Sequence, residues 1–445
     1  MARPDAAEDP RICEEPPISI PPWSQGGFPH RRRHPKRMKL LQVITGMNPE
    51  SGGVTHVVKT LSPILMEMGI DNEILSADCR NASYLPAAPL KIHALGPAAT
   101  SWGYRAELAV WLRRNLHQYD GVICHGLWQF PLFAVRRRIE ALRREARAPK
   151  FFIYPHGMLD PWFQKDPSRR MKALRNEIYW RLAERQNINA ADAVLFTCDE
   201  ERRLASTTFP GYAAKEKVVG YGVPEPPPST AAAREAFAAS CPQVDPEKPY
   251  LIFLSRLHPK KGIDLLIEVH AEMARSGKPI PDLVVAGPMN CDYAMQMKAL
   301  AERLLPASES GGGPRIHFTG MLEGLAKWGA LRGALALVLP SHQENFGIAI
   351  VESLACSVPV LISQRINIWK TIADSGAGLA DTDDSGGVRR LLESITTMDP
   401  ASLEKMRFLS RQCFEQEFSC SEAGNRLKKV LVPDAALTPS TGSLV

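Results

Sequence analysis

Residues 335–355 read LALVLPSHQENFGIAIVESLA, and the pattern changes twice within this stretch. The first five residues are apolar and have the length of a fully buried strand. A polar turn follows and ends at Gly347, directly before a second apolar segment. A helix that starts there has free backbone N–H groups in its first turn, and these attract anions. The stretch therefore predicts a strand, an anion-binding turn and a helix.

The same alternation of short apolar runs and helical segments extends in both directions. Strands are predicted at residues 39–44, 72–76, 120–124, 150–154, 192–196 and 217–220, and again at 250–255, 282–286, 315–319, 336–340, 358–362 and 377–380. Two helical segments carry an apolar face: Leu132, Val135, Ile139 and Leu142 in 131–147, and Met171, Leu174, Ile178 and Leu182 in 168–185. Strands that alternate with helices predict an α/β fold with parallel sheets covered by helices.

A proline-rich segment divides this pattern into two similar parts. We expect an N-terminal domain at 38–222, a linker at 223–248 that holds a short Ala-rich helix, and a C-terminal domain at 249–430. Residues 1–37 and 431–445 lack either period and are expected to be a disordered leader and a tail, with Met38 as an alternative start. Ligands of such sheets bind beyond the carboxyl ends of the strands.

Composition excludes several classes of protein. The chain has 445 residues, of which 44% are hydrophobic and 23% charged, so it is neither disordered as a whole nor a small disulfide scaffold. No apolar run approaches the roughly 18 residues of a membrane-spanning helix. The nine cysteines form no C-x-x-C pair, which favours a reducing, cytoplasmic compartment.

Charge is distributed unevenly between the two parts. Residues 38–222 carry a net charge of +7 and residues 223–445 a net charge of −3. Arginines concentrate in the helical segments 131–147 and 168–185. Two interpretations fit: a pair of solvated basic faces, or a surface that contacts an anionic membrane. Nucleic acid is not expected as a partner.

Charged side chains follow two of the predicted strands in the second part. Arg256 and Lys261 lie in SRLHPKKGID, just after the strand at 250–255, and would meet one anion at this turn. Glu344 and Glu352 flank the turn that ends at Gly347, and at this spacing they would reach different parts of one ligand. Each motif alone also fits ordinary surface charge.

Taken together, these segments resemble the retaining GT-B glycosyltransferases of the family 4 (group 1) type. The resemblance also covers the opening strand and glycine loop, MKLLQVITGMNPESGGV at 38–54. It implies two Rossmann-like, doubly wound parallel-sheet domains that face each other across a cleft. It further implies transfer of a hexosyl group from a nucleotide sugar to a hydroxyl of a glycan or lipid-linked acceptor, with retention, in the synthesis of surface polysaccharide or lipopolysaccharide.

The resemblance also assigns residues to the donor. It implies that Arg256 and Lys261 bind the diphosphate and stabilise the leaving nucleotide, that Glu352 binds the ribose, and that Glu344 lies near the transferred sugar. The loop glycines Gly52 and Gly53 would approach the diphosphate, and the amides of Asn345, Phe346 and Gly347 would contact sugar or phosphate.

Two histidines follow strands of the first part. His125 and His156 each precede a glycine, and His156, in PHGMLDPW, is the better match to the histidine that the family places near the reacting sugar. A structural role within its own turn remains an alternative for each. No cluster with metal-ligand spacing occurs, so we expect neither metal nor cofactor.

Other activities compete with this prediction. A catalytically silent sugar-nucleotide-binding module would not need Arg256, Lys261, Glu344 and Glu352 together. A GT-B epimerase would release free nucleotide without an acceptor, and a phosphorylase would require a pyridoxal lysine. The sequence does not identify the sugar, the base or the acceptor, and the membrane-contacting alternative would place the enzyme on the inner face of the membrane.

Overall fold

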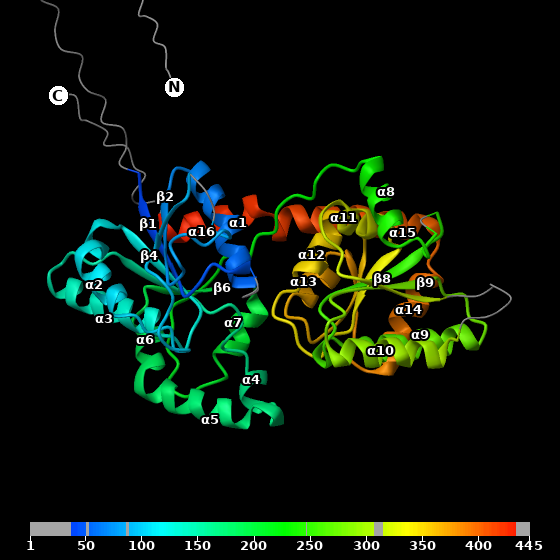
Figure 1. Ribbon diagram of the computed structural model, residues 1–445, viewed down its shortest axis with the longest axis horizontal. Coiled ribbons are helices and arrows are strands. Elements are labelled where there is room, and N and C mark those ends of the chain that lie inside the picture. Colours follow the sequence, from blue (N-terminus) through cyan, green and yellow to red (C-terminus); the bar gives the residue numbers. More distant parts are fainter. Residues whose placement is uncertain (1–36, 50–52, 86–88, 246, 307–314, 433–445) are drawn as a thin grey trace, which may run out of the picture. The chain divides into compact units, whose positions relative to one another are not determined.

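A computed structural model describes residues 37–432 except 50–52, 86–88, 246 and 307–314 (Figure 1). Most of the predicted leader (1–37) and tail (431–445) therefore lies outside the described residues, and so does Gly52. Within the described ranges, no helix is long and apolar enough to cross a membrane.

Two parallel sheets organise the described chain. The first has the order β3-β2-β1-β4-β5-β6-β7 and the second the order β10-β9-β8-β11-β12-β13, and every pair of neighbouring strands is parallel. Their bounds are β1 Lys39–Ile44, β2 Asp71–Ser76, β3 Lys91–Ala94, β4 Gly121–His125, β5 Lys150–Tyr154, β6 Ala193–Phe196, β7 Glu216–Val218, β8 Tyr250–Leu254, β9 Asp282–Ala286, β10 Ile316–Gly320, β11 Ala336–Leu339, β12 Val360–Ser363 and β13 Gly378–Asp381.

Both sheets reverse their strand order beside their first strand. β1 lies between β2 and β4, and β8 lies between β9 and β11, so each sheet has a switch point where loops diverge. The expected doubly wound α/β architecture is confirmed. The predicted strands agree with those observed to within two residues at each end, but β3 was missed because it is a four-residue, partly exposed strand at a sheet edge.

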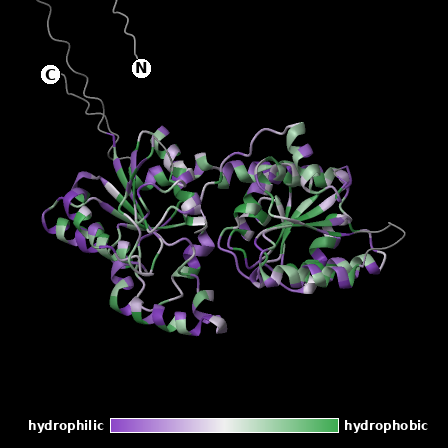
Figure 2. Cartoon of the chain, in the orientation of Figure 1, coloured by the Kyte–Doolittle hydropathy of each residue, from purple (hydrophilic) through white to green (hydrophobic). Residues whose placement is uncertain are grey.

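Helices cover these sheets. In the first part they are α1 Gly53–Glu67, α2 Ala106–Asn115, α3 Phe130–Arg144, α4 Trp162–Lys165, α5 Arg170–Tyr179, α6 Arg185–Ala190 and α7 Asp199–Ala205. They continue with α8 Ala231–Ser240, α9 Ile263–Arg275, α10 Asp292–Leu304, α11 Gly324–Gly333, α12 Ile348–Ala355, α13 Trp369–Asp374, α14 Ser385–Thr396, α15 Pro400–Cys413 and α16 Cys420–Leu431. Hydrophobic residues concentrate on the strands between the helices (Figure 2).

The two segments that join the parts have specific packing. The Ala-rich helix expected in 223–248 is α8, and it packs closely on α11, where a Cβ on Gly329 would collide with the carbonyl oxygen of Ala233. The last helix, α16, packs on α1: Lys428 Nζ donates to the Met68 carbonyl oxygen over 3.1 Å. This return of the chain is a long-range contact that no local pattern indicates.

The predicted helix at 168–185 differs most from expectation. It begins as a short 3₁₀ turn, Pro167–Arg169, continues as α5, and widens into a π-helical turn at Trp180–Glu184 before α6. Its apolar face does not pack on the sheet: Met171, Leu174, Ile178 and Leu182 are exposed by 79, 56, 51 and 72%. The buried side instead carries Asn176 and Trp180, whose indole N–H donates to the Pro210 carbonyl oxygen at 2.9 Å.

Candidate active site

A cavity of about 580 Å³ lies at the carboxyl ends of strands from both sheets. Its lining includes all the predicted site residues that the structure describes: Gly53, His156, Arg256, Lys261, Glu344, Asn345, Phe346, Gly347 and Glu352. The sequence-predicted residues, which are up to 299 positions apart, therefore meet in one place. Of the predicted set, only Gly52 lies outside the described residues.

Two loops of the second sheet form the basic wall of the cavity. The loop after β8 holds Arg256 and ends at Gly262, which has a φ of +65°. A Cβ on Gly262 would collide with the carbonyl oxygen of Pro340, so glycine is required for the loops after β8 and β11 to meet. This contact brings the Lys261 ammonium into an ion pair with Glu344.

Arg256 is the exposed cation of this wall. Among the described residues its guanidinium has no ion-pair partner, so it is available to a ligand anion. The positive charge here also acts on a neighbour: burial, and then Arg256, Lys260 and Lys261, lower the pKa of His258. The local potential therefore favours a negatively charged ligand.

The first turn of α12 opens into the same cavity. Gly347, with a φ of +78°, is its N-cap, and the next two residues, Ile348 and Ala349, also line the cavity. The free N–H groups of this turn and the helix dipole favour an anion. The predicted strand, turn and helix are thus all present.

Glu352 is held by a lysine that the sequence analysis missed. Lys327, on α11, donates to Glu352 Oε1 over 2.7 Å, and both residues line the cavity. Glu344 and Glu352 therefore pair with different lysines and face different regions. Lys327 had no distinguishing signal in the sequence, because it is one lysine on a helix of mostly small and apolar residues.

Tyr221 connects the two walls and was also missed. Its hydroxyl donates to the Gly53 carbonyl oxygen, and its ring stacks on Phe346 with centroids 4.7 Å apart. A Cβ on Gly53 would lie 2.6 Å from the Tyr221 hydroxyl, so this close approach requires glycine. The glycines on either side of Tyr221 were the available signal.

A chain of hydrogen bonds determines the tautomers of the two histidines. The Ser62 hydroxyl donates to the Val58 carbonyl oxygen at 2.5 Å, so Ser62 accepts from Gln42 Nε2 at 2.8 Å. Gln42 Oε1 then accepts from His125 Nε2 at 2.9 Å. His125 Nδ1 therefore carries the lone pair and accepts from His156 Nε2 at 3.0 Å.

The chain ends at His156 Nδ1 as an acceptor. Burial lowers the pKa of His125 to about 3, and burial followed by the neighbouring His125 lowers the pKa of His156, so both rings are neutral at pH 7. Among the described residues His156 Nδ1 has no hydrogen-bond partner. Of the two histidines that follow strands of the first part, His156 lines the cavity and His125 lies behind it.

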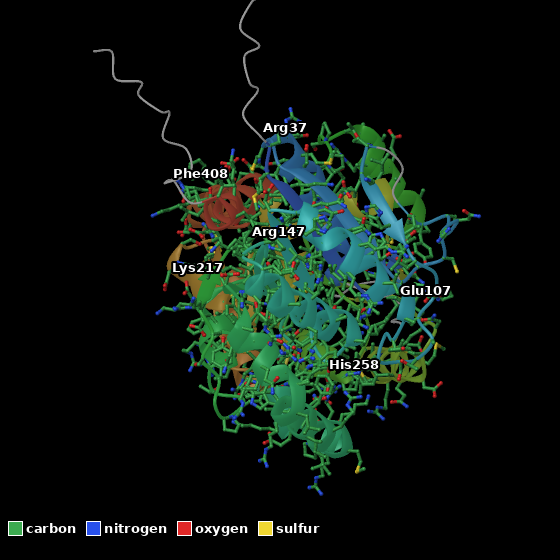
Figure 3. The ribbon with its side chains drawn as sticks, turned by 90° about the vertical axis from the view of Figure 1, so that its left-hand side faces the viewer. Arg37, Glu107, Arg147, Lys217, His258 and Phe408 are labelled. Carbon is green, nitrogen blue, oxygen red and sulfur yellow. The ribbon has the colours of Figure 1, made fainter. Side chains whose placement is uncertain are left out.

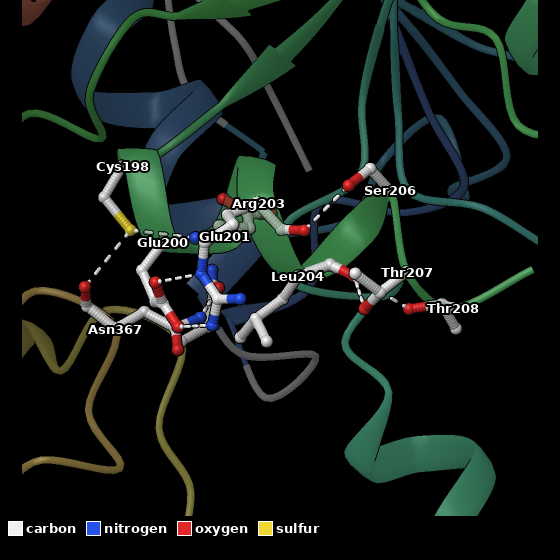
Figure 4. A network of polar contacts seen from close by, with 10 residues as sticks. Cys198, Glu200, Glu201, Arg203, Leu204, Ser206, Thr207, Thr208 and Asn367 are labelled. Carbon is white, nitrogen blue, oxygen red and sulfur yellow. Dashed lines mark hydrogen bonds and ion pairs between the residues drawn. The ribbon is translucent and has the colours of Figure 1, made fainter.

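The loop that carries His156 is held by contacts from both parts. The Gly157 N–H donates to the buried Glu201 carboxylate over 2.5 Å, and a Cβ on Gly157 would lie 2.7 Å from Asn345 Cγ. Asn345 in turn accepts from Asn367 Nδ2 at 3.1 Å, and the Asn367 carbonyl oxygen contacts Cys198 Sγ at 3.6 Å (Figure 4). These contacts set the orientation of the Asn345 side chain.

Metal ligands do not cluster in the part of the chain that the structure describes: no group of three or more His, Cys, Asp or Glu side chains could hold an ion. The carboxylates of the Asp381-Thr382-Asp383 sequence are used in structural contacts. Asp381 forms an ion pair with Arg390, and Asp383 forms one with Arg365 and lies 3.0 Å from His342 Nδ1.

Known proteins resemble this chain in sequence and in fold. Residues 240–397 match the family described as glycosyl transferases group 1, and residues 52–222 match the glycosyl transferase 4-like domain. A D-inositol 3-phosphate glycosyltransferase from Kribbella flavida is 31% identical over 209 residues, which are 44% of this chain and 46% of that protein. The chain spans about half the length of the curated relatives it matches.

Solved structures extend the similarity to nearly the whole chain. Anabaena HepE in complex with UDP-glucose has a TM-score of 0.64 at 15% identity, over 88% of this chain and 99% of HepE. WaaG, a glycosyltransferase involved in lipopolysaccharide biosynthesis, has a TM-score of 0.59 at 16% identity, over 88% of this chain and 100% of WaaG. With two family matches in adjacent parts and this fold, the chain belongs to the group 1 (family 4) glycosyltransferases of the GT-B type.

Proposed function

We propose that the protein transfers a hexosyl group from a nucleotide sugar to a hydroxyl of a glycan or lipid-linked acceptor, with retention of configuration. The observation that carries this proposal is the convergence on one cavity of Arg256, Lys261 and the first turn of α12. Two cations and a helix N-terminus together form a site for a diphosphate.

In this proposal each wall of the cavity has its own role. Arg256 and Lys261 neutralise charge that develops on the leaving diphosphate, and Glu352, held by Lys327, accepts hydrogen bonds from the ribose hydroxyls. Glu344 lies near the transferred sugar. When donor binds, the diphosphate would compete with Glu344 for Lys261, which frees the carboxylate to accept a sugar hydroxyl.

His156 would serve as a neutral hydrogen-bond acceptor on the opposite wall. Its Nδ1 lone pair has no partner in the Gln42–His125 chain and is buried, so we propose that donor binding exposes it to a hydroxyl of the reacting sugar. With two cations and a helix terminus at the diphosphate, we propose that the reaction needs no metal ion.

The relatives and the charge distribution support a proposal for the acceptor and its setting. WaaG acts in lipopolysaccharide biosynthesis, and the Kribbella relative is named for transfer to an inositol phosphate. We favour a surface-polysaccharide or lipopolysaccharide acceptor, reached from the inner face of the membrane by the more basic N-terminal part of the chain, whose residues 38–222 carry +7.

Nucleotide release from a panel of nucleotide sugars tests the proposal. The protein should release nucleotide from one donor when a cell-envelope lipid extract is present, and much less without it. The transferred sugar should appear on the acceptor in the anomeric configuration of the donor. Release that does not depend on any acceptor would indicate an epimerase, and donor binding without release a silent binding module.

A further inference from the structure

The solvent side of α5 and the π-helical turn after it is apolar. Met171, Leu174, Ile178 and Leu182 follow one another at intervals of three and four residues, and their exposed fractions are between 51 and 79%. We call these four side chains the α5 stripe. Residues at this spacing lie on one side of a helix, so the stripe is continuous. It is the side that a globular protein ordinarily turns inward.

The stripe cannot turn inward, because the opposite side of the helix is already anchored. Trp180 is fully buried, and its indole donates to the Pro210 carbonyl oxygen at 2.9 Å. Its ring stacks on Phe209 with centroids 4.7 Å apart. Asn176 is buried on the same side. Rotation of the helix would expose Trp180 and break these contacts, so the stripe stays outward.

Basic side chains flank the stripe on both sides. Residues 165–185 carry a net charge of +4. The exposed cations are Lys165, Arg170, Lys172, Arg175, Arg181 and Arg185. The segment has three acidic residues. Glu184 is buried and Glu177 pairs with Arg181 at 2.8 Å, so Asp166 is the remaining carboxylate that could offset the other cations of the segment. An apolar stripe flanked by Arg and Lys is typical of a helix that lies in the interface of an anionic bilayer.

The other basic helix does not have this character. α3 buries Leu132, Val135, Ile139 and Leu142, and one of its arginines, Arg136, is also buried and donates to Asn187 Oδ1 at 2.6 Å. Arg136 therefore does not belong to the basic face expected for the segment 131–147. Arg147, just beyond the helix, is exposed (Figure 3). α3 offers charge to a surface, but no apolar side chains that could insert.

The segment before α5 connects the stripe to the cavity. Asp160 lies four residues after His156. Its Oδ2 accepts a hydrogen bond from Gln343 Nε2 at 2.7 Å. Lys260, next to the proposed diphosphate ligand Lys261, lies over the Trp162 ring of α4 with its ammonium 4.4 Å from the ring centroid. The stripe therefore begins nine residues beyond Trp162, with α4 and the 3₁₀ turn Pro167–Arg169 in between, and Trp162 contacts the direct neighbour of the cavity residue Lys261.

We infer that the α5 stripe inserts into the surface of an anionic lipid bilayer and holds the cavity beside it. This inference rests on the proposed function in one respect, because it gives the lipid-linked acceptor a route to the cavity. A second copy of the chain is a poorer occupant, since symmetric pairing of two stripes would bring two segments of net charge +4 together.

Vesicle co-sedimentation tests this inference without any donor. The full chain should sediment with vesicles that contain phosphatidylglycerol, and not with pure phosphatidylcholine vesicles. Raising the salt from 0.1 to 1 M shortens the Debye length from ~10 to ~3 Å and should release most of the bound protein. The double variant Leu174→Ser/Leu182→Ser should lose affinity about tenfold or more, because two leucines no longer enter the bilayer.

A matched control distinguishes insertion of the α5 stripe from nonspecific binding through any exposed apolar side chain. Phe408 is 67% exposed on α15, and Phe408→Ser should leave vesicle binding unchanged. Thermal unfolding should be the same for all three proteins, because the changed side chains face solvent. Equal binding of the double variant and the wild type, or no wild-type binding at low salt, would overturn the inference. So would a wild-type dimer in solution that the double variant abolishes.

The readout also distinguishes this inference from the proposed function. Transfer to a detergent-solubilised acceptor should be the same in the double variant as in the wild type, while transfer to the same acceptor in vesicles should fall. If no donor is used by either protein, the proposed function fails while vesicle binding still decides the role of the stripe.

Discussion

The two walls of the cavity differ in how they are stabilised. The wall from the second sheet is ionic: Lys261 pairs with Glu344, Lys327 pairs with Glu352, and Arg256 has no ion-pair partner among the described residues. The wall from the first sheet is neutral, with His156 and His125 hydrogen-bonded in series to Gln42. Charged groups suit a diphosphate, and neutral groups of defined tautomer suit hydroxyls, so the difference separates leaving-group binding from sugar recognition.

The largest effect is expected at the unpaired cation of the ionic wall. Arg256→Ala should lower kcat/KM by ~10²–10³, the scale for the loss of one group that stabilises charge in the transition state. Steady-state nucleotide release measures it. Arg234, an exposed arginine of α8, supplies the control Arg234→Ala, which should keep full activity. Unchanged turnover in Arg256→Ala would remove the ionic wall from the reaction.

The neutral wall should make stability depend on pH. Burial lowers the pKa of His125 to about 3 in the folded protein, whereas an unperturbed histidine in the unfolded chain has a pKa of about 6.5. Below that pH the unfolded state binds more protons than the folded state, so the free energy of unfolding falls as pH drops. Between pH 6.5 and pH 5, the protonation of His125 in the unfolded chain should lower the free energy of unfolding by about 2 kcal/mol.

Urea unfolding of the wild type and of His125→Asn between pH 7 and pH 5 measures this dependence. The variant should be less stable at pH 7 but should show a shallower slope with pH. Identical slopes would mean that His125 is not held neutral by burial.

Lys327 tests the second ion pair of the ionic wall. Lys327→Met keeps the length of the side chain but leaves Glu352 without its partner, so the carboxylate is no longer oriented. The KM for the donor should rise about tenfold with a smaller change in kcat, because ribose binding contributes equally to the ground and transition states. Lys298→Met, on the exposed side of α10, is the matched control. A fall in kcat alone would place Lys327 in the chemical step instead.

A smaller effect is expected from Gln42, at the far end of the hydrogen-bond series that leads through His125 to His156. Gln42→Leu fills the same buried space but removes the acceptor for His125 Nε2, so the tautomers of both histidines are no longer determined. Nitrogen NMR of the imidazoles should show mixed tautomers for His156, and kcat should fall severalfold while the KM for donor is unchanged. A single tautomer in the variant would show that Gln42 does not set it.

No effect is expected from metal removal, because the ionic wall offers two cations and a helix terminus to the diphosphate. Excess chelator should leave the rate of nucleotide release unchanged, and added Mg²⁺ or Mn²⁺ should not raise it. Loss of activity in EDTA that one metal restores would show that the cations of this wall are not sufficient.

Local sequence was enough for the parts of the site that follow a strand. Arg256, Lys261, Glu344 and Glu352 could be predicted because the carboxyl ends of parallel strands gather at one edge of a sheet. Lys327, Tyr221 and Gln42 could not, since each acts through a partner on a distant segment: Glu352, Gly53 and His125. The predicted domain boundaries and residue roles stay predictions.

The sequence by itself determined the alternation of strands and helices, the glycines at the tight turns and the separation of charge between the two parts. Tertiary structure alone decided which side of each helix is buried. The apolar periods of α3 and α5 look alike in the sequence, yet α3 buries its apolar side and α5 exposes it. A helical period specifies that one side of a helix is apolar, but burial depends on which side the rest of the protein contacts. For α5 the contacted side is the one that leads to Trp180, which stacks on Phe209 and donates to the Pro210 carbonyl oxygen.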